Sequence, residues 1–378
     1  MKASGKLPRL PPFPKFVGLR VSTTTPLVPF ICDIIAKDGP ITLERYMEIV
    51  LQHPQHGYYR QGNPLGTSGD FITSPEASPM FGEMIGIWCV EVWKRLGSPS
   101  PFILLELGPG QGTLLHTALQ FTQHIADFTQ ALKLYLFESS STLCKIQKER
   151  LSTYSPIHID DLRNLPSWPT IVIANEFFDT LPIRQFIRSR LGWRERLIKH
   201  KDGEFQFASR YRMGLPKNIL INPRAHKTKL GGIYEVSTQA CFFMDIVSSH
   251  IAQNSGAGLI IDYGYISPPE NGTLDALSQQ KFVDVFSLPG KVDVTAGVDF
   301  AILAAIAAQK GNITADLITQ REFLERMGIL SRADMLRTQA DNMQKTTVNI
   351  GLRYIASHSE MGKFRVFEFG RIQNNPFN

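Results

Sequence analysis

A glycine-rich run, ELGPGQG at residues 106–112, has the composition and the position of a ligand-binding turn. It follows an apolar run at 102–107 and precedes a stretch with helical spacing at 113–121, so the pattern predicts a strand, a tight turn and a helix. Gly108 and Gly110 can take positive φ and let the backbone approach a ligand, and the first N–H groups of a helix carry partial positive charge. The run therefore predicts a binding site for a nucleotide or a carboxylate.

The spacing of the glycines favours one class of ligand. The dinucleotide fingerprint has glycines at its first, third and sixth positions, whereas Gly108, Gly110 and Gly112 occupy the first, third and fifth. This spacing favours S-adenosylmethionine over NAD, because S-adenosylmethionine has no pyrophosphate to place on the helix N-terminus. It has an amino-acid head group instead, which suits Glu106 at the end of the preceding strand. We therefore expect S-adenosylmethionine as the cofactor.

Two further acids extend this interpretation. Glu138 ends the next apolar run and is placed to accept hydrogen bonds from both ribose hydroxyls, and Asp161 is a candidate for the adenine amino group. Gly-Pro-Gly is also common in ordinary turns, and a strand-terminal Glu is often only solvated. Because these residues occur together, in order, at the ends of successive strands, the pattern favours a cofactor site.

Asn175, Glu176 and Asp179 follow the apolar run at 170–174, the position where class I methyltransferases, which this pattern resembles, have the residues that face the methyl group. Methyl transfer from a sulfonium needs no metal. It needs an acceptor lone pair held in line with the methyl group, and a carboxylate or carbonyl that orients the acceptor and takes its proton. The three side chains supply these groups. An alternative stays open, in which they cap a helix and complement its dipole.

The loop GTSGDFITSPE at 66–76 is rich in small and hydroxyl residues and contains Asp70 and Glu76. If it folds over the ends of the strands, it is a lid that orders both the cofactor and the acceptor. The alternative is an Ω-loop that is held together by Asp and Ser turns. We include both acids among the candidate catalytic residues.

The elements that would position these residues have the order of a doubly wound α/β fold. Apolar runs predict buried strands at 102–107, 132–137, 170–174 and 258–261, with helices between them. We therefore predict a Rossmann-like, mostly parallel sheet with an antiparallel edge strand at 363–369. Residues 186–235 are predicted as an insertion that contains a β-hairpin turning at Asp202-Gly203.

The chain divides into three predicted regions. Residues 1–28 are a basic, Pro-rich segment, either a targeting sequence or a flexible tail. Residues 29–100 supply two short helices, the second with Thr42 as its N-cap, and the lid loop. Residues 101–378 form the Rossmann-like core with its insertion.

Composition excludes several classes of function. The 378-residue chain has a formal charge of +6, but five Lys and Arg before Asp33 supply most of it, so the rest of the chain is nearly neutral and a nucleic-acid groove is not expected. No apolar run approaches the roughly 20 residues that span a bilayer. The four cysteines lie far apart without a C-x-x-C pair, which argues against a zinc site and a disulfide framework.

Several of these stretches resemble the MidA-like family of class I S-adenosylmethionine-dependent methyltransferases. The motifs that carry the resemblance are HPQHGYY at 53–59, GDFITSPEAS at 69–78, FGEMIGIW at 81–88, ELGPGQGTL at 106–114, ANEFFDTLPIRQF at 174–186, IDYGY at 261–265 and DVTAGVDFAIL at 293–303. The resemblance runs from about residue 29 to residue 369.

The resemblance implies a methyltransferase that modifies an arginine of a respiratory complex I subunit and supports assembly of that complex. The expected location is the mitochondrial matrix in a eukaryote and the cytoplasm in a bacterium. It also implies that Gly108, Gly110 and Gly112 line the cofactor, and that Asp70, Glu76, Asn175, Glu176 and Asp179 face the joint cavity. A guanidinium is always protonated, so carboxylates in bidentate reach suit an arginine acceptor.

Gln111 stands where the family commonly has Arg, so the acceptor contacts can differ from those of the family. Two other functions stay open. One is an NAD-dependent oxidoreductase, against which the glycine spacing and the lack of an evident Tyr-x-x-x-Lys relay count. The other is a non-catalytic assembly factor that keeps the fold and binds a subunit without modifying it.

Overall fold

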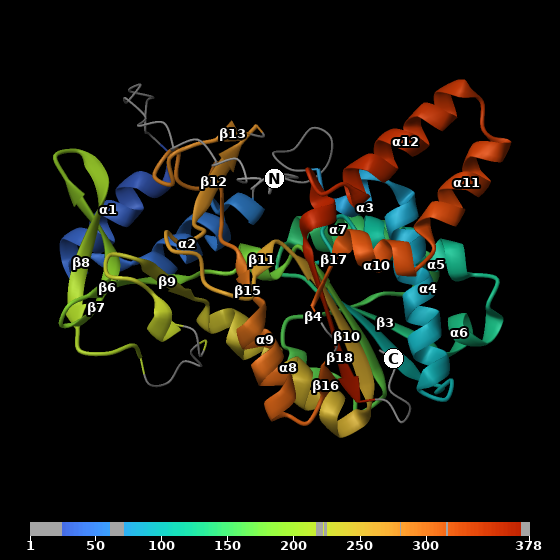
Figure 1. Ribbon diagram of the computed structural model, residues 1–378. Helices are drawn as coiled ribbons and strands as arrows, with labels where there is room; N and C mark the ends of the chain where they lie inside the picture. The colour runs from blue at the N-terminus through green and yellow to red at the C-terminus, as the bar shows by residue number, and fades with distance from the viewer. Residues whose placement is uncertain are drawn as a thin grey trace, which may run out of the picture.

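The computed structural model describes residues 25–60, 72–216, 222, 225–279, 281–314 and 317–371. These residues form a large layered α/β part and a smaller β-rich part, which lie side by side (Figure 1). Residues 1–24 of the predicted tail, and Asp70 in the predicted lid, lie outside the described residues. None of the described helices is both long and apolar enough to cross a membrane.

The central sheet of the layered part has eight strands in the order β16-β18-β10-β5-β2-β3-β4, with β17 also pairing with β18. Five of them are parallel: β4 (Ile157–Ile159), β3 (Leu132–Phe137), β2 (Phe102–Leu107), β5 (Thr170–Asn175) and β10 (Gly256–Asp262). Numbered along the chain, these five lie in the order 3-2-1-4-5, which is the doubly wound arrangement. The predicted Rossmann-like fold is therefore confirmed.

Alternate residues of each strand pack into two different cores. In β2, Leu104 belongs to the core that contains α4 (Pro79–Arg95) and α5 (Thr113–Thr122), while Ile103 and Leu105 belong to the core that contains α8 (Thr238–Asn254) and α9 (Phe300–Gln309). Because helices cover both faces, every position of β2 is buried. This is why these strands are continuous apolar runs in the sequence.

The predicted edge strand is antiparallel but does not form an edge. β18 (Arg365–Arg371) pairs with β10 on one side, and with β16 (Ile313–Thr314) and β17 (Ile318–Thr319) on the other. The two outer strands have two residues each, so no alternating pattern could reveal them. The prediction of an edge position was wrong for this reason.

Two helices near the C-terminus were not predicted. α11 (Ile329–Gln339) and α12 (Asn342–Ala356) follow α10 (Gln320–Arg326) and form a hairpin beside α3 (Ser74–Ala77) and α4 (Figure 1). The remaining helices of the layered part are α6 (Ala126–Ala131) and α7 (Ser141–Arg150). The guanidinium of Arg332 on α11 makes a bidentate contact with the carboxylate of Glu83 on α4, at 2.7 and 2.8 Å.

The β-rich part is an antiparallel sheet of β1 (Ile41–Thr42), β6 (Arg184–Ser189), β7 (Gly192–Lys201), β8 (Glu204–Arg212) and β9 (Ile233–Val236). β7 and β8 form the predicted hairpin, and both turn residues have positive φ, 55° at Asp202 and 83° at Gly203. Its last four strands span residues 184–236, around the predicted insertion at 186–235. The division of the chain into regions stays a prediction.

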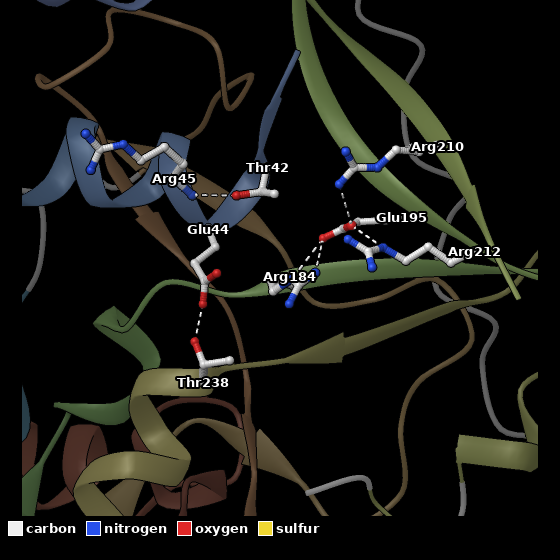
Figure 2. Close-up of polar contacts among 8 residues, drawn as sticks. All are labelled: Thr42, Glu44, Arg45, Arg184, Glu195, Arg210, Arg212 and Thr238. Atoms are coloured by element: carbon white, nitrogen blue, oxygen red, sulfur yellow. Dashed lines mark hydrogen bonds and ion pairs between the residues drawn. The ribbon is translucent and has the colours of Figure 1, made fainter. Parts of the chain in front are cut away.

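The N-terminal helices join this sheet to the layered part. α1 (Leu27–Asp38) and α2 (Leu43–Gln52) pack in one core with β7, and the predicted N-cap is present, because Thr42 accepts a hydrogen bond from the N–H of Arg45. The hydroxyl of Thr238, at the start of α8, donates to the carboxylate of Glu44 on α2 (Figure 2). The N-terminal helices therefore contact both parts of the molecule.

Residues 266–297, whose composition predicts loops, contain three short strands in their described part and lie between two more. β12 (Asp275–Ser278) pairs with β13 (Lys281–Phe282) and β14 (Asp293–Thr295), and β11 (Gly264–Tyr265) pairs with β15 (Val298–Asp299). The main chain of Ala296 donates to the carbonyl of Asp179. This segment therefore reaches the carboxyl end of β5.

Candidate active site

A cavity opens at the carboxyl ends of β2 and β5. Its lining consists of Thr73, Pro75, Glu76, Glu106, Gly108, Pro109, Gly110, Gln111, Thr113, Leu114, Asn175 and Glu176. Six of the predicted site residues are therefore brought together here, from three separate stretches of sequence. A cleft at the carboxyl ends of the strands is where doubly wound sheets bind their ligands.

The glycine-rich loop has the backbone conformation that its composition predicts. Gly108, Gly110 and Gly112 have φ of 64°, 53° and 77°, a region that favours glycine. A Cβ on Gly108 would lie 2.7 Å from the ring of Phe177, which is too close for contact. Gly112 is the N-cap of α5, so the first turn of this helix begins at the cavity. A side chain at any of these positions would strain the loop.

Glu106 lies at the end of β2 with its side chain almost fully buried, at 2% exposure. Burial, and secondly the nearby Glu138 carboxylate, raise the pKa of Glu106 to about 8. Among the described residues, neither Oε2 of Glu106 nor Oδ1 of Asn175 has a hydrogen-bond partner. Two buried acceptors on one cavity suit an ammonium donor, which is what the head group of S-adenosylmethionine carries.

Glu138, at the end of β3, is tied to the glycine-rich loop through Gln147 on α7. Its carboxylate accepts hydrogen bonds from the N–H of Ser140 at 2.7 Å and from Nε2 of Gln147 at 3.3 Å. The same Nε2 donates to the carbonyl of Gly110 at 2.6 Å. Burial raises the pKa of Glu138 despite these contacts. Gln147 is fully buried, and sequence analysis assigned it no role.

Asp161 is not brought to the cavity. It caps the short helix η3 (Leu162–Asn164), and its carboxylate contacts the guanidinium of Arg163 at 2.6 to 3.0 Å. Hydrogen bonds from the Arg163 side chain and main chain lower the pKa of Asp161 to about 2. These contacts satisfy the carboxylate outside the cofactor cavity.

The described part of the predicted lid forms one wall of the cavity. The hydroxyl of Thr113 donates to the carboxylate of Glu76 at 2.6 Å, and the N–H of Ser74 donates to Glu176 at 3.3 Å. The segment 73–76 therefore contacts both the first residue of α5 and the end of β5. Whether the loop moves as a lid stays a prediction.

Three carboxylates meet where β5 and β10 end. Burial and Asp179 raise the pKa of Glu176 to about 8, and burial raises the pKa of Asp179 to about 6. Burial, with Asp179 and Glu176, also raises the pKa of Asp262 well above its usual range. Among the described residues, Oδ1 of Asp179 has no hydrogen-bond partner although it is buried. We call Glu176, Asp179 and Asp262 the acid cluster.

The segment after β5 does not form the α-helix that the alternative interpretation required. It contains only the three-residue turn η4 (Phe178–Thr180), and Phe177 is its N-cap. The side chains of Asn175 and Glu176 contact each other at 3.1 Å and line the cavity instead of capping a helix. Glu176 also has a positive φ of 50°, a strained conformation for a residue with a side chain.

Other parts of the chain complete the acid cluster. The hydroxyl of Tyr59, in the turn η1 (Tyr58–Arg60), donates to Asp293 on β14 at 2.8 Å, and the hydroxyl of Thr295 donates to Asp179 at 3.3 Å. Burial, then Asp293 and Asp179, raise the pKa of Tyr59 well above its usual range, which places it beside the cluster. Sequence analysis assigned no role to these residues or to Asp262.

Comparisons with known proteins agree with this geometry. A family model described as "Putative S-adenosyl-L-methionine-dependent methyltransferase" matches residues 84–319. The chain is 33% identical over 366 residues to protein arginine methyltransferase NDUFAF7, mitochondrial, of Danio rerio, covering 90% of this chain and 85% of that protein. It is 34% identical over 339 residues to the Homo sapiens protein of the same name, covering 82% and 75%.

A solved structure agrees with the predicted cofactor. A Burkholderia thailandensis protein bound to S-adenosyl-homocysteine superposes with a TM-score of 0.79 at 26% identity, covering 93% of this chain and 92% of that one. S-adenosyl-homocysteine is what remains of S-adenosylmethionine after methyl transfer. S-adenosylmethionine is therefore confirmed over NAD, and the chain belongs to this family of S-adenosyl-L-methionine-dependent methyltransferases.

Proposed function

We propose that this methyltransferase modifies the guanidinium of an arginine in a protein acceptor. The names of the curated relatives support this acceptor, because they are protein arginine methyltransferases. The observation that carries the proposal is the acid cluster, which lies beside the cofactor cavity and has raised pKa values at all three carboxyls. Clustered carboxylates of this kind are what a permanently charged guanidinium requires.

The electrostatics of the acid cluster explain why a cation would bind. Desolvation and mutual repulsion disfavour the ionised forms of Glu176 and Asp179 in the free protein. A guanidinium between them would neutralise the repulsion and supply N–H donors to carboxylate oxygens, including the unpartnered Oδ1 of Asp179. A neutral acceptor would supply no such compensation. The acid cluster therefore favours a positively charged acceptor.

The residues of the cavity divide into those that hold the cofactor and those that act on the acceptor. We place the amino-acid head group against Glu106 and Asn175, the glycine-rich loop along the cofactor, and the ribose at Glu138. When bound, S-adenosylmethionine supplies an electrophilic methyl group. The carboxylate of Glu176, fixed by Ser74 and Asn175, orients the guanidinium and accepts the proton that its nitrogen loses.

We further propose that the acceptor is a subunit of respiratory complex I, and that the protein supports assembly of that complex. In a eukaryote this places it in the mitochondrial matrix, as the word mitochondrial in the relatives' names suggests. In a bacterium the location would be the cytoplasm.

The test is transfer of labelled methyl groups to complex I subunits from cells that lack this protein. The purified chain and S-adenosylmethionine with a labelled methyl group are incubated with these subunits, and mass spectrometry locates the label. We expect labelled methylarginine in one subunit, and at least about a hundredfold less with the Glu176→Gln variant. Label on another residue type would refute the arginine acceptor. Cofactor binding without transfer to any subunit would favour the non-catalytic assembly factor.

A further inference from the structure

The positive charge of the chain is concentrated on the five-stranded antiparallel sheet of the β-rich part. Residues 184–212 contain nine Lys and Arg and three Asp and Glu, a net +6 that equals the charge of the whole chain. The first 20 residues contribute five more positive charges, so the remainder is net negative. The body of the protein is therefore nearly neutral in sum, as expected, but strongly polarised.

Three arginines of this sheet converge on one buried carboxylate. Glu195 on β7 has a fully buried side chain, and it accepts hydrogen bonds from Arg184 on β6 and from Arg210 and Arg212 on β8 (Figure 2). The contact of Arg184 Nε with Oε1 is 2.8 Å, and that of Arg210 Nη2 with Oε2 is 3.4 Å. Because side chains alternate along a strand, these four residues share one face.

The three arginines carry more positive charge than the Glu195 carboxylate can neutralise. One carboxylate and three guanidiniums leave an excess of two positive charges. Arg184 is mostly covered, at 14% side-chain exposure, whereas Arg212 and Arg210 reach solvent at 34% and 58%. In the described part of the chain, Arg212 contacts Glu195 through Nε alone and Arg210 through Nη2 alone. The buried Glu195 therefore holds two partly exposed guanidiniums in place.

We propose that Arg210 and Arg212, positioned by Glu195, form a docking site for an acidic segment of a partner protein. A carboxylate of the partner would accept N–H groups of both guanidiniums, in the paired geometry that arginine favours. The partner is the acceptor protein itself, an identification that rests on the proposed function. The sheet would then hold the acceptor at a distance from the site where its arginine reacts.

The observations favour a protein over a nucleic acid. Three arginines of the sheet lie over aromatic rings: Arg184, which also binds Glu195, over Phe186, Arg188 over Trp193 and Arg196 over Phe207, at 4.4 to 5.2 Å. Of the nine Lys and Arg in the described residues 184–212, four then remain that contact neither an aromatic ring nor Glu195, whereas strong nucleic-acid binding uses about 6 to 10 phosphate contacts. Exposed Leu191 and Met213 lie at the ends of the same strands, next to Gly192 and Arg212. Arg and Met are both enriched in protein interfaces.

The experiment measures binding of fluorescein-labelled poly-L-glutamate and of labelled oligo(dT) to the full chain by fluorescence anisotropy. We expect poly-L-glutamate to bind more tightly than oligo(dT), with an affinity that falls as salt is added. Arg210→Gln/Arg212→Gln should weaken poly-L-glutamate binding by about tenfold or more. Tighter binding of oligo(dT), or no binding of poly-L-glutamate, would overturn the proposal.

The matched control is Arg190→Gln/Arg194→Gln. It removes the same charge from the same sheet, but Arg190 lies in the β6–β7 turn and Arg194 on the opposite face from Glu195. An equal loss in both double variants would mean a diffuse charge effect and would overturn a specific site. Binding of S-adenosylmethionine by calorimetry should be unchanged in both, which shows that they fold.

Methylation of the acceptor separates this proposal from the proposed function. The substrate here is the unmethylated form of the subunit that the protein methylates. With this substrate, Arg210→Gln/Arg212→Gln should raise KM and leave kcat near that of the unaltered protein. An unchanged KM in this double variant would refute the docking site and leave the proposed methyl transfer unaffected. Absence of transfer by the unaltered protein, with poly-L-glutamate binding intact, would refute the proposed function and leave the docking site standing.

Discussion

The backbone N–H of Ser74 donates a 3.3 Å hydrogen bond to the side-chain carboxylate of Glu176. This contact joins the segment before α4 to the end of β5, two stretches about a hundred residues apart in sequence. It fixes the carboxylate at a position where the backbone is already constrained by a positive φ. The cofactor cavity and the acid cluster therefore share one wall.

Replacing Glu176 with Gln should reduce turnover and leave the cavity intact. The amide oxygen can still accept the Ser74 hydrogen bond, but the side chain can no longer take a proton. We expect kcat to fall by about a hundredfold or more, with the Kd for S-adenosyl-homocysteine little changed in calorimetry. Glu91→Gln, which changes an exposed acid on α4, is the control. Full activity of Glu176→Gln would remove this residue from the mechanism.

The buried carboxyl of Glu106 should make the ligand-free protein less stable as the pH rises. Its pKa is about 8 in the folded state and 4.5 in the unfolded reference. Its contribution to stability is therefore complete below about 4.5 and is lost as the pH rises through about 8.

Glu106→Gln removes this titration. At pH 8 the variant should exceed the unaltered protein in free energy of unfolding by at least about 1 kcal/mol, and the difference should vanish near pH 4.5. Urea unfolding at several pH values measures this, with Glu91→Gln again as control. A difference that does not depend on pH would show that burial of the charge is not the cause. The same variant should bind S-adenosylmethionine more weakly, because the ammonium group loses its carboxylate.

Gly108→Ala should weaken cofactor binding through both strain and collision. Its φ of 64° costs about 1–2 kcal/mol for a residue with a Cβ, and that Cβ would lie 2.7 Å from Phe177. Gly203 also has positive φ but has open space around it, so Gly203→Ala isolates the strain. We expect Gly108→Ala to weaken S-adenosyl-homocysteine binding at least about tenfold and Gly203→Ala to leave it unchanged. Equal affinities would argue against this placement of the cofactor.

The central part of the fold and of the site could be predicted because each rests on a local pattern. β2 is buried on both faces and is therefore a continuous apolar run that ends at Glu106 and the glycines. The rule that parallel strands end at one sheet edge then places Glu106 beside Asn175. The same rule would have found Asp262 at the end of β10. Applied to Asp161, it failed to give a cavity residue, because that carboxylate caps η3 and pairs with Arg163.

The rest of the site depends on contacts between distant segments. Tyr59 and Asp293 are 234 residues apart and meet only because η1 and β14 both pack beside the acid cluster. No spacing in the sequence encodes this. Similarly, the charge count located the positive residues of the tail. It did not reveal the positive charge of residues 184–212, because acids elsewhere in the chain cancel that charge in the total. α11 and α12 were missed because few of their residues are buried.

Tyr59→Phe should affect the acceptor and not the cofactor. The change removes the hydroxyl that donates to Asp293, so that carboxylate is less well neutralised beside the acid cluster. We expect the kcat/KM for the acceptor to fall by about fivefold or more, as for loss of a hydrogen bond to a charged group, with unchanged affinity for S-adenosylmethionine. Tyr154→Phe, in a partly buried tyrosine of the turn η2 (Ser152–Tyr154), is the control. Weakened cofactor binding would place Tyr59 in the cofactor site instead.

The Glu83–Arg332 pair should carry much of the attachment of α11 to the layered core. Both side chains are mostly covered, at 11% and 25% exposure, and the guanidinium also lies 5.2 Å from the ring of Phe121. Glu83→Gln keeps the shape but removes the charge that the guanidinium contacts, which should cost about 1–3 kcal/mol of unfolding free energy in urea. Glu325→Gln breaks the exposed pair with Arg321 on α10 and should cost little. Equal effects would mean that the buried pair contributes no more than a surface one, and that α11 is held by the apolar contacts of Ile329 and Ala333.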